Sequence, residues 1–410
     1  MFGRTCVQSL IDTDFYKLTM QQAYLHQLPT AEGVWEFRCR NDEDLSVYVP
    51  AIRAELESLA ELYVTDDQLA YLRRRAPYLS SDYLQFLKLF RFNPAMLEVG
   101  VERGQLMIRA RGPQLHISPF EIPVMACVSE IRNRHRYPEV SDEQVRKSTY
   151  GKIQQLQQLA DQHDLSDFRF TDFGTRRRFS FAAHKQVVEM LKAGLPDHFS
   201  GTSNPLLARE FNLPCIGTMA HEWLQTHQGL NYRLVDSQKA ALENWVKEYR
   251  ADLGIALTDI IGVDAFCRDL DRYFAKLYDG FRHDSGDPIL WGEKILARLE
   301  QLRVDPTSKT LVFSDGLDFT RAVAIHNHFR GRIRTSFGIG TWLMGDFGVN
   351  KPLNIVMKMV SLGGQPVAKI SDSPGKTMCR DRNFINYLME VFAVDASVRA
   401  QVLDNLPVAV

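Results

Sequence analysis

The sequence has few cysteines, and their spacing excludes several kinds of site. The six cysteines among the 410 residues lie at least 33 positions apart, so no C-x-x-C pair is present. A structural zinc site needs closely spaced thiolates, and a disulfide framework needs a denser set of cysteines. Scattered single thiols are typical of a reducing compartment. We therefore expect all six cysteines to be structural residues.

The sequence also lacks an excess of charge and a long apolar run. Lys and Arg number 49 against 50 Asp and Glu, a formal net charge of -1. A dedicated nucleic-acid-binding protein usually carries a basic excess. No run of about 18 apolar residues could cross a membrane, and the first residues contain no apolar core of a signal peptide. We therefore expect a cytoplasmic protein with neither nucleic acid nor membrane as a partner.

Several familiar motifs are missing. No G-x-x-x-x-G-K-[ST] sequence is present, which excludes a P-loop. His221-Glu222 is not followed by a second histidine at the metalloprotease spacing, and the glycines at 338–340 lack the third glycine of a dinucleotide fingerprint. The two D-F-G triplets have no glycine-rich loop and H-R-D sequence before them, which argues against a protein kinase.

From about residue 166 onward, short apolar runs alternate with helical patterns. The residues that end these runs lie 18 to 38 positions apart, which is the size of a β-α unit. The seven residues are Asp172, Ser203, His221, Asp259, Asp284, Asp315 and Gly340. This alternation predicts an α/β fold, with residues 141–352 forming an irregular β/α barrel. An open, doubly wound parallel sheet is the alternative.

Residues 1–140 have a mixed pattern that predicts an N-terminal α/β (α+β) domain. The elements we expect there are a strand at 33–40, helices at 51–63 and 81–90, and a hairpin joining 106–110 to 115–117.

The end of the chain returns to hairpin character. Apolar runs at 354–361 and 365–371 flank Leu362-Gly363-Gly364, which is a turn signal. We therefore expect about 353–410 to complete the N-terminal domain.

The placement of polar residues indicates where the chemistry lies. Active sites of β/α barrels lie at the carboxyl ends of the strands, where the runs end in Asp, Ser, His or Gly. Converging carboxylates need positive partners, and Mg²⁺, Arg176 and Arg282 could supply them. A neutral His221 could act as a base or a nucleophile, and Gly338–Gly340 could hold a phosphate on backbone N–H groups. The pattern predicts an enzyme that handles phosphorylated, Mg²⁺-bound substrates.

Several longer motifs resemble the bacterial nicotinate phosphoribosyltransferases, of the type II phosphoribosyltransferase family. The matching segments cover nearly the whole chain in the expected order: TDFYKLTMQQAY at 13–24, FTDFGTRRR at 170–178, SGTSNPLLAREF at 200–211, GTMAHEW at 217–223, YFAKLYDGFRHDSGDP at 273–288, FSDGLDF at 313–319 and FGIGT at 337–341. G-T-M-A-H-E-W together with R-H-D-S-G-D-P is a highly specific pair.

The resemblance implies a fold and an activity. It implies an N-terminal α/β domain packed on an irregular barrel, in a homodimer that shares its active site. The implied reaction joins nicotinate to phosphoribosyl pyrophosphate, giving nicotinate mononucleotide and pyrophosphate with Mg²⁺, in NAD salvage. ATP would be a co-substrate whose hydrolysis is coupled to synthesis.

The resemblance also implies roles for the polar loop residues. His221 would be a phosphohistidine that carries the γ-phosphoryl group of ATP. Asp259 and Asp284 would hold the ribosyl diphosphate and its Mg²⁺. Residues implied for the ribose hydroxyls and the 5′-phosphate are Asp315, Gly316, Gly338, Gly340, Thr341 and Arg176.

The pyridine ring would lie between two aromatic side chains, Phe173 and a Tyr16 contributed by the neighbouring subunit. The related nicotinamide enzyme carries Asp at the position of Ser203. An aspartate would repel a carboxylate, so Ser203 favours the acid, which Arg282 can pair with.

Three alternatives stay open at this point. Within the class, the substrate could be nicotinamide or quinolinate. A barrel aldolase or lyase would need an activated lysine at a strand end, which Lys358 fits poorly because it lies inside an apolar strand. A binding barrel without turnover is the third alternative.

Overall fold

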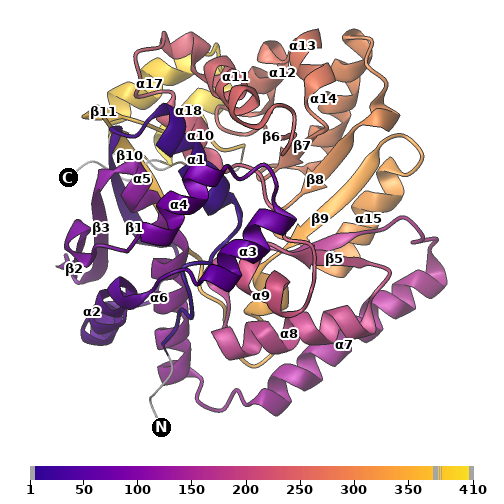
Figure 1. Cartoon of the computed structure of the whole chain (residues 1–410). Coiled ribbons are helices and arrows are strands. Elements are labelled where there is room, and N and C mark those ends of the chain that lie inside the picture. Colours follow the sequence, from indigo (N-terminus) through magenta and orange to yellow (C-terminus); the bar gives the residue numbers. More distant parts are fainter. Residues whose placement is uncertain (1–4, 373–376, 378, 380, 406–410) are drawn as a thin grey trace.

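The computed structural model describes residues 5–372, 377, 379 and 381–405, and it contains two sheets. One is antiparallel with the strand order β11-β10-β1-β3-β2, and the other is parallel with the order β5-β4-β9-β8-β7-β6. Figure 1 shows the two sheets on opposite sides of the molecule, with helices covering the parallel sheet. The chain therefore has the predicted α/β fold, with a parallel and an antiparallel part.

The antiparallel sheet is built from both ends of the chain. Its central strand β1 (Glu32–Cys39) pairs with β3 (Gln105–Pro113) on one side and with β10 (Ile355–Leu362) on the other. The edge strands are β2 (Leu97–Glu102) and β11 (Gln365–Pro366). In Figure 1 the yellow β10 accordingly lies beside the indigo β1.

The prediction of a hairpin that joins 106–110 to 115–117 is wrong. The turn lies earlier, at Arg103 and Gly104, whose φ angles of 52° and 75° are those of a two-residue hairpin loop. Strand β3 therefore pairs backward with β2 and continues through Pro113, and the next four residues form a short helix, α5 (Gln114–Ile117).

The parallel sheet follows the apolar runs of the sequence. Its strands are β4 (Phe170–Asp172), β5 (Phe199–Thr202), β6 (Ile255–Leu257), β7 (Gly280–His283), β8 (Thr310–Phe313) and β9 (Arg334–Ile339). The third of the seven runs, which ends at His221, makes only an isolated bridge, between Cys215 and Thr202. On its other side, Thr218 Oγ1 donates to the carbonyl of Ile255 in β6 at 3.2 Å. This segment thus spans the two edges of the sheet without a regular strand.

Helices connect the strands, and their starts agree with the sequence signals. Asn204 caps α9 (Pro205–Glu210) and Asp287 caps α14 (Pro288–Gln301), each by accepting two backbone N–H groups. The helices expected at 51–63 and 81–90 correspond to α2 and α4. The remaining bounds are α1 (Tyr16–Gln27), α2 (Val49–Ser58), α3 (Asp66–Arg75), α4 (Ser81–Leu89), α6 (Glu121–Arg136), α7 (Asp142–Gln162), α8 (Phe181–Gly194), α10 (His221–Thr226), α11 (Ser237–Tyr249), α12 (Val263–Asp269), α13 (Arg272–Leu277), α15 (Phe319–Phe329), α16 (Thr341–Met344), α17 (Arg382–Val391) and α18 (Ala396–Asp404).

Each sheet has its own buried apolar core, and the C-terminal segment contributes to both. Met357 and Val367 belong to the core of the antiparallel sheet. Ile385 and Leu388 of α17 belong instead to the core of the parallel sheet. The proposed boundaries at 140 and 352 stay a prediction, and parts of the 353–410 segment lie outside the described residues.

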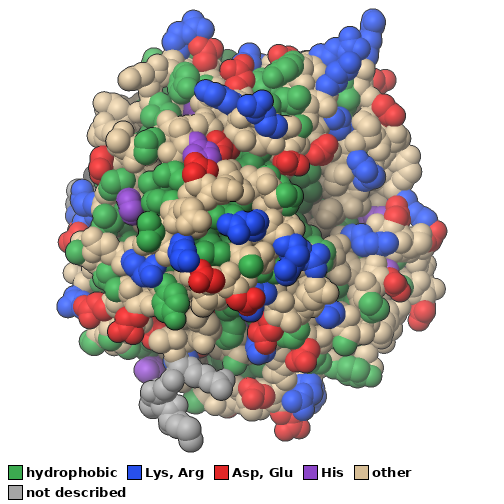
Figure 2. Space-filling model, viewed as in Figure 1, with side chains coloured by type: hydrophobic (Ala, Val, Ile, Leu, Met, Phe, Trp, Pro, Cys, Tyr) green, Lys and Arg blue, Asp and Glu red, His purple; other side chains and the backbone are tan. Residues whose placement is uncertain are grey.

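The surface and the thiols show no unusual feature. Figure 2 shows acidic and basic side chains interspersed over the visible face. No described helix has the length and apolar character needed to cross a membrane. All six cysteines are free thiols.

Candidate active site

A cavity of about 560 Å³ lies between the carboxyl ends of the parallel strands and the N-terminal part of the chain. The residues predicted for the site are brought together here, with Asp259 directly behind the wall. Those that line the cavity are Tyr16, Phe173, Arg176, Ser203, His221, Arg282, Asp284, Asp315, Gly316, Gly338, Gly340 and Thr341. The strand-end signals of the sequence thus lead to one place in the fold.

His221 is held by a buried carboxylate. It is the first residue of α10, and its Nε2 lies 2.7 Å from Asp259 Oδ1. Because Asp259 is ionised, Nε2 must carry the proton and donate it, which leaves the lone pair of the neutral ring on Nδ1. Burial and the nearby Lys369 ammonium lower the pKa of His221 to about 4, outweighing the opposite effect of Asp259. The imidazole is therefore neutral near pH 7, as a nucleophile or base requires.

Lys369 is a site residue that the sequence patterns did not reveal. Its Nζ lies 2.6 Å from Asp259 Oδ2 and 3.9 Å from Asp284 Oδ2, and it lines the cavity. Burial would raise the pKa of Asp259, but Lys369 and His221 hold it well below the ordinary value. Ser285 Oγ also donates to Asp259 Oδ2 at 2.6 Å. Both oxygens of Asp259 are thus engaged within the protein.

Asp284 is the carboxylate with a free side. Ser314 Oγ donates to its Oδ1 at 2.8 Å, and its Oδ2 lies 3.8 Å from His221 Nε2. The pKa of Asp284 is lowered to about 2, because Lys369 and His221 outweigh burial. Its side chain is 21% exposed, whereas that of Asp259 is 1% exposed. Asp284 can therefore accept a cation from the cavity, and Asp259 serves to hold His221.

Phe173 and Gly338 form one wall of the cavity together. A Cβ added at Gly338 would lie 2.2 Å from the Phe173 ring, so only glycine leaves space for that ring. A Cβ at Gly340 would lie 2.7 Å from the Phe173 carbonyl oxygen. These glycines therefore seat Phe173, in addition to the phosphate contact expected for them. Tyr16 lines the same cavity of the same chain, so this geometry does not require a neighbouring subunit to supply it.

Ser203 and Arg282 line the cavity and could bind a negatively charged substituent of a ring. Ser203 Oγ donates its proton to Asp14 Oδ1 at 2.6 Å, so the hydroxyl can accept a hydrogen bond from a ligand but does not donate one. Burial raises the pKa of Asp14, despite the opposing effects of Ser203 and Arg176. Arg282 donates through one terminal nitrogen to the carbonyl of Met219 at 3.1 Å, and its buried Nε has no hydrogen-bond partner among the described residues. Arg282 also lines the cavity, where it adds positive charge.

Further cations line the cavity. Sequence reasoning missed Arg40, Arg177 and Lys358, which join Arg176 and Lys369 in its wall. Burial, Lys369 and Arg40 hold the pKa of Lys358 well below its ordinary value. The position of Lys358 within an apolar strand argues against the activated lysine of an aldolase or lyase, but this residue of β10 lines the cavity. A cavity with this set of cations is suited to a ligand with several negative charges.

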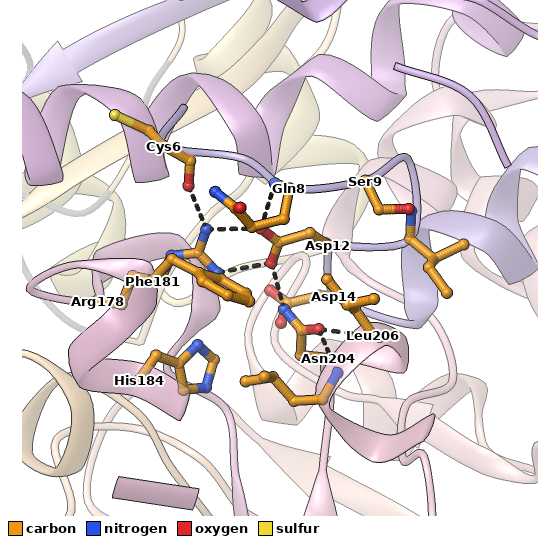
Figure 3. Close-up of polar contacts among 12 residues, drawn as sticks. Cys6, Gln8, Ser9, Asp12, Asp14, Arg178, Phe181, His184, Asn204 and Leu206 are labelled. Carbon is orange, nitrogen blue, oxygen red and sulfur yellow. Dashed lines mark hydrogen bonds and ion pairs between the residues drawn. The ribbon is translucent and has the colours of Figure 1, made fainter. Parts of the chain in front are cut away.

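A buried ion pair fixes the loop that carries Arg176. Arg178 donates to both oxygens of Asp12, at 2.6 and 2.8 Å, and to the carbonyl of Cys6. Asn204 donates to the same carboxylate at 2.8 Å. Figure 3 shows the Arg178 guanidinium between Cys6 and Asp12, with Asn204 on the other side of the carboxylate. This network ties the start of the chain to the loops after β4 and β5, which carry Arg176 and Ser203.

Comparisons with known proteins identify the family of the chain. The sequence model of the nicotinate phosphoribosyltransferase (NAPRTase) family matches residues 168–396, and the model of its N-terminal domain matches residues 11–129. The chain belongs to the nicotinate phosphoribosyltransferase family. Nicotinate phosphoribosyltransferase 1 of Pseudomonas aeruginosa is 57% identical over 396 residues, covering 97% of this chain and 99% of that relative. The protein is therefore an enzyme of this family.

Solved structures of the family show the same fold. The nicotinate phosphoribosyltransferase from Vibrio cholerae superimposes with a TM-score of 0.94 and 41% identity, covering 98% of this chain and 97% of that chain. The nicotinate phosphoribosyltransferase from Porphyromonas gingivalis gives a TM-score of 0.88 and 35% identity, covering 95% and 100%.

Proposed function

We propose that this enzyme joins nicotinate to phosphoribosyl pyrophosphate, with ATP hydrolysis coupled through a phosphohistidine at His221. The names of the relatives motivate the choice of nicotinate. The pyridine nitrogen would attack C1 of the ribose, the bond from C1 to the diphosphate oxygen would break, and pyrophosphate would leave. The products are nicotinate mononucleotide and pyrophosphate, in NAD salvage.

The observation that carries the proposal is the His221–Asp259 pair in the wall of a cation-rich cavity. Nδ1 of the neutral ring would attack the γ-phosphorus of ATP, and the bond to the bridging oxygen would break to release ADP. The ring becomes cationic during this attack, and Asp259 lies 2.7 Å from Nε2 to stabilise it. Water later cleaves the phosphorus–nitrogen bond and releases inorganic phosphate.

Mg²⁺ fits the site through one carboxylate. Oxygen ligands suit this ion, which keeps several waters and uses few protein carboxylates beside substrate phosphates. His221, Asp259 and Asp284 offer three donor atoms within 4.8 Å of one another. Asp284 has the open oxygen, whereas Asp259 is occupied by His221, Lys369 and Ser285. We therefore assign the ion to Asp284, where it would supply positive charge to the diphosphate.

The cations of the wall account for the anionic groups of the substrates. Arg282 lines the cavity, and its positive charge suits the carboxylate of nicotinate. Phe173 offers one face for the ring. Asp315 and Gly316 would bind the ribose hydroxyls, and Thr341 the 5′-phosphate. A homodimer and a cytoplasmic location remain proposals drawn from the family resemblance and composition.

Product analysis with the purified protein tests the proposal. Nicotinate, phosphoribosyl pyrophosphate and Mg²⁺ are supplied with and without ATP, and nicotinate mononucleotide is quantified. We expect product formation that rises with ATP, together with acid-labile labelling by γ-labelled ATP that is lost in His221→Ala. Product from nicotinamide or quinolinate alone would reject the assigned substrate. Full labelling of His221→Ala would reject the phosphohistidine.

A further inference from the structure

A buried cluster of charges lies between the N-terminal part of the chain and α10, and its two carboxylates, Glu121 and Glu222, line the cavity. Lys17 Nζ lies 2.5 Å from Glu121 Oε2 and 2.7 Å from Glu222 Oε1. Ser118 Oγ donates to both oxygens of Glu222 at 3.0 Å. The side chains of Lys17 and Glu222 are only 1% and 3% exposed. One ammonium group is thus shared between two carboxylates, away from solvent.

Two cations face the two carboxylates of this cluster. Arg176 lies 3.9 Å from Glu121 Oε1 and supplies the second positive charge. The ring of Trp35 lies 4.6 Å from Lys17 Nζ, where a cation–π contact stabilises the ammonium. Removing one member of such a buried cluster leaves an uncompensated charge, so the positions of the others depend strongly on it.

The position of the cluster in the chain gives it a consequence for the site. Lys17 follows Tyr16, and Glu222 follows His221. Tyr16 is the first residue of α1 and His221 is the first residue of α10, and both line the cavity. The Lys17–Glu222 pair therefore joins the start of the helix that carries the aromatic wall to the start of the helix that carries the proposed phosphoryl acceptor.

A second set of contacts holds the start of α1 against the segment before α10. Thr19 Oγ1 donates to the carbonyl of Thr218 at 2.7 Å, so α1 is also bonded to the segment before His221. A Cβ added at Gly217 would lie 3.1 Å from the backbone nitrogen of Tyr16. The two helix starts pack against each other with little space, and a shift of one must be followed by the other.

We propose that Lys17 and Glu222 are positioning residues that couple the phosphorylation state of His221 to the binding of the substrate ring beside Tyr16. This inference rests on the proposed function, because it needs phosphorylation at His221. Negative charge added at His221 attracts Lys17 toward α10, and Lys17 can redistribute between Glu222 and Glu121 as it moves. That movement reaches Tyr16 through the adjacent peptide bond. Phosphorylation then changes the affinity for the ring without any direct contact between the phosphoryl group and the ring.

The test is the ratio of the KM for nicotinate without ATP to the KM with ATP. In the wild type we expect a ratio well above one. In Lys17→Met and Glu222→Gln it should fall toward one, by at least about 5-fold, the lower end of typical coupling between sites. Lys17→Arg keeps the charge and should recover part of the ratio. A purely structural role would lower thermal stability and leave the ratio unchanged.

Two further variants keep the test decisive. Glu43→Gln breaks another ion pair, in which Arg132 lies 2.6 Å from Glu43. Neither residue lines the cavity. This variant controls for lost stability and should keep the wild-type ratio. Ser118→Ala removes one hydrogen-bond donor to Glu222 and leaves all charges in place, so it is expected to fold and to lower the ratio moderately.

The outcomes distinguish a failure of ATP coupling from a failure of the role proposed for Lys17 and Glu222. A wild-type ratio of one overturns the ATP coupling of the proposed function, and this inference with it. A wild-type ratio above one that Lys17→Met, Glu222→Gln and Ser118→Ala all retain overturns the inference alone. A fall that Glu43→Gln reproduces also overturns it. If the two charge-removing variants do not fold, an unchanged ratio in Ser118→Ala is sufficient to reject it.

Discussion

The most direct test of the site is Asp259→Asn, which keeps the shape of the side chain and removes its charge. Asp259 accepts from His221 Nε2 at 2.7 Å and lies 2.6 Å from Lys369 Nζ. A hydrogen bond to a charged group contributes about 1.5–3 kcal/mol. If Asp259 stabilises the cationic ring only during phosphoryl transfer, its loss slows labelling by roughly 10- to 150-fold.

A second effect of Asp259→Asn acts in the same direction. An amide can turn its N–H₂ group toward His221 Nε2, and the ring proton then moves to Nδ1. The atom proposed to attack phosphorus would lose its lone pair in that tautomer. The two effects together should therefore slow the labelling of Asp259→Asn by at least the roughly 10- to 150-fold estimated from the lost hydrogen bond alone.

The assay is rapid-quench labelling of the enzyme with γ-labelled ATP, and thermal unfolding confirms that the variant is folded. Removing a partner of the buried Lys369 should lower stability by about 3–5 kcal/mol, so labelling is measured well below the melting temperature. Ser285→Ala is the matched control, because it removes one donor to Asp259 and leaves the charge. A labelling rate of folded Asp259→Asn within roughly 2-fold of wild type would refute the role derived from the 2.7 Å contact.

Three other changes have defined outcomes. Ser203→Asp adds a carboxylate beside Asp14, now 2.6 Å from the serine hydroxyl, and should lower kcat/KM for nicotinate more than for nicotinamide; equal effects on both would contradict the selection argument. Phe173→Ala should raise the KM for nicotinate by roughly 2- to 12-fold, and Gly338→Ala, whose Cβ would displace that ring, should do the same. Burial lowers the pKa of His227 to about 4, so the folded protein resists protonation that the unfolded chain accepts below its ordinary value of 6.5. Stability should therefore fall by up to about 3 kcal/mol from pH 6.5 to pH 4, and urea unfolding of His227→Gln should show a flatter pH dependence.

The sequence predicted the parallel half of the fold well because local signals repeat there. Apolar runs, N-caps and strand-end polar residues recur at similar spacing, and each residue that ends a parallel strand lies near the others. The N-terminal hairpin was misplaced because Gly112-Pro113 is the stronger turn signal by composition. The actual turn at Arg103-Gly104 depends on an arginine with a φ of 52°, which composition does not indicate.

The site residues that were missed belong to contacts distant in sequence. Lys369 reaches Asp259 across 110 positions, and no local pattern marks such a pair. The three consecutive arginines after β4 show the same limit. Arg176 and Arg177 line the cavity, whereas Arg178 is fully buried against Asp12. Their charges are identical in the sequence, and only tertiary packing separates a ligand contact from a structural ion pair.

The short segment from Asp12 to Lys17 explains why the cavity needs both parts of the chain. Asp12 pairs with Arg178, Asp14 accepts from Ser203, and Lys17 pairs with Glu222. Every second or third side chain of this segment therefore bonds to a different loop of the parallel sheet, and Tyr16 between them faces the cavity. The two ion pairs and the hydrogen bond form only when the segment is docked, and a buried Arg178 or Glu222 would otherwise lack its partner of opposite charge. The parallel sheet alone therefore does not form the site, because docking of the N-terminal segment also aligns the loops that carry Arg176, Ser203 and His221.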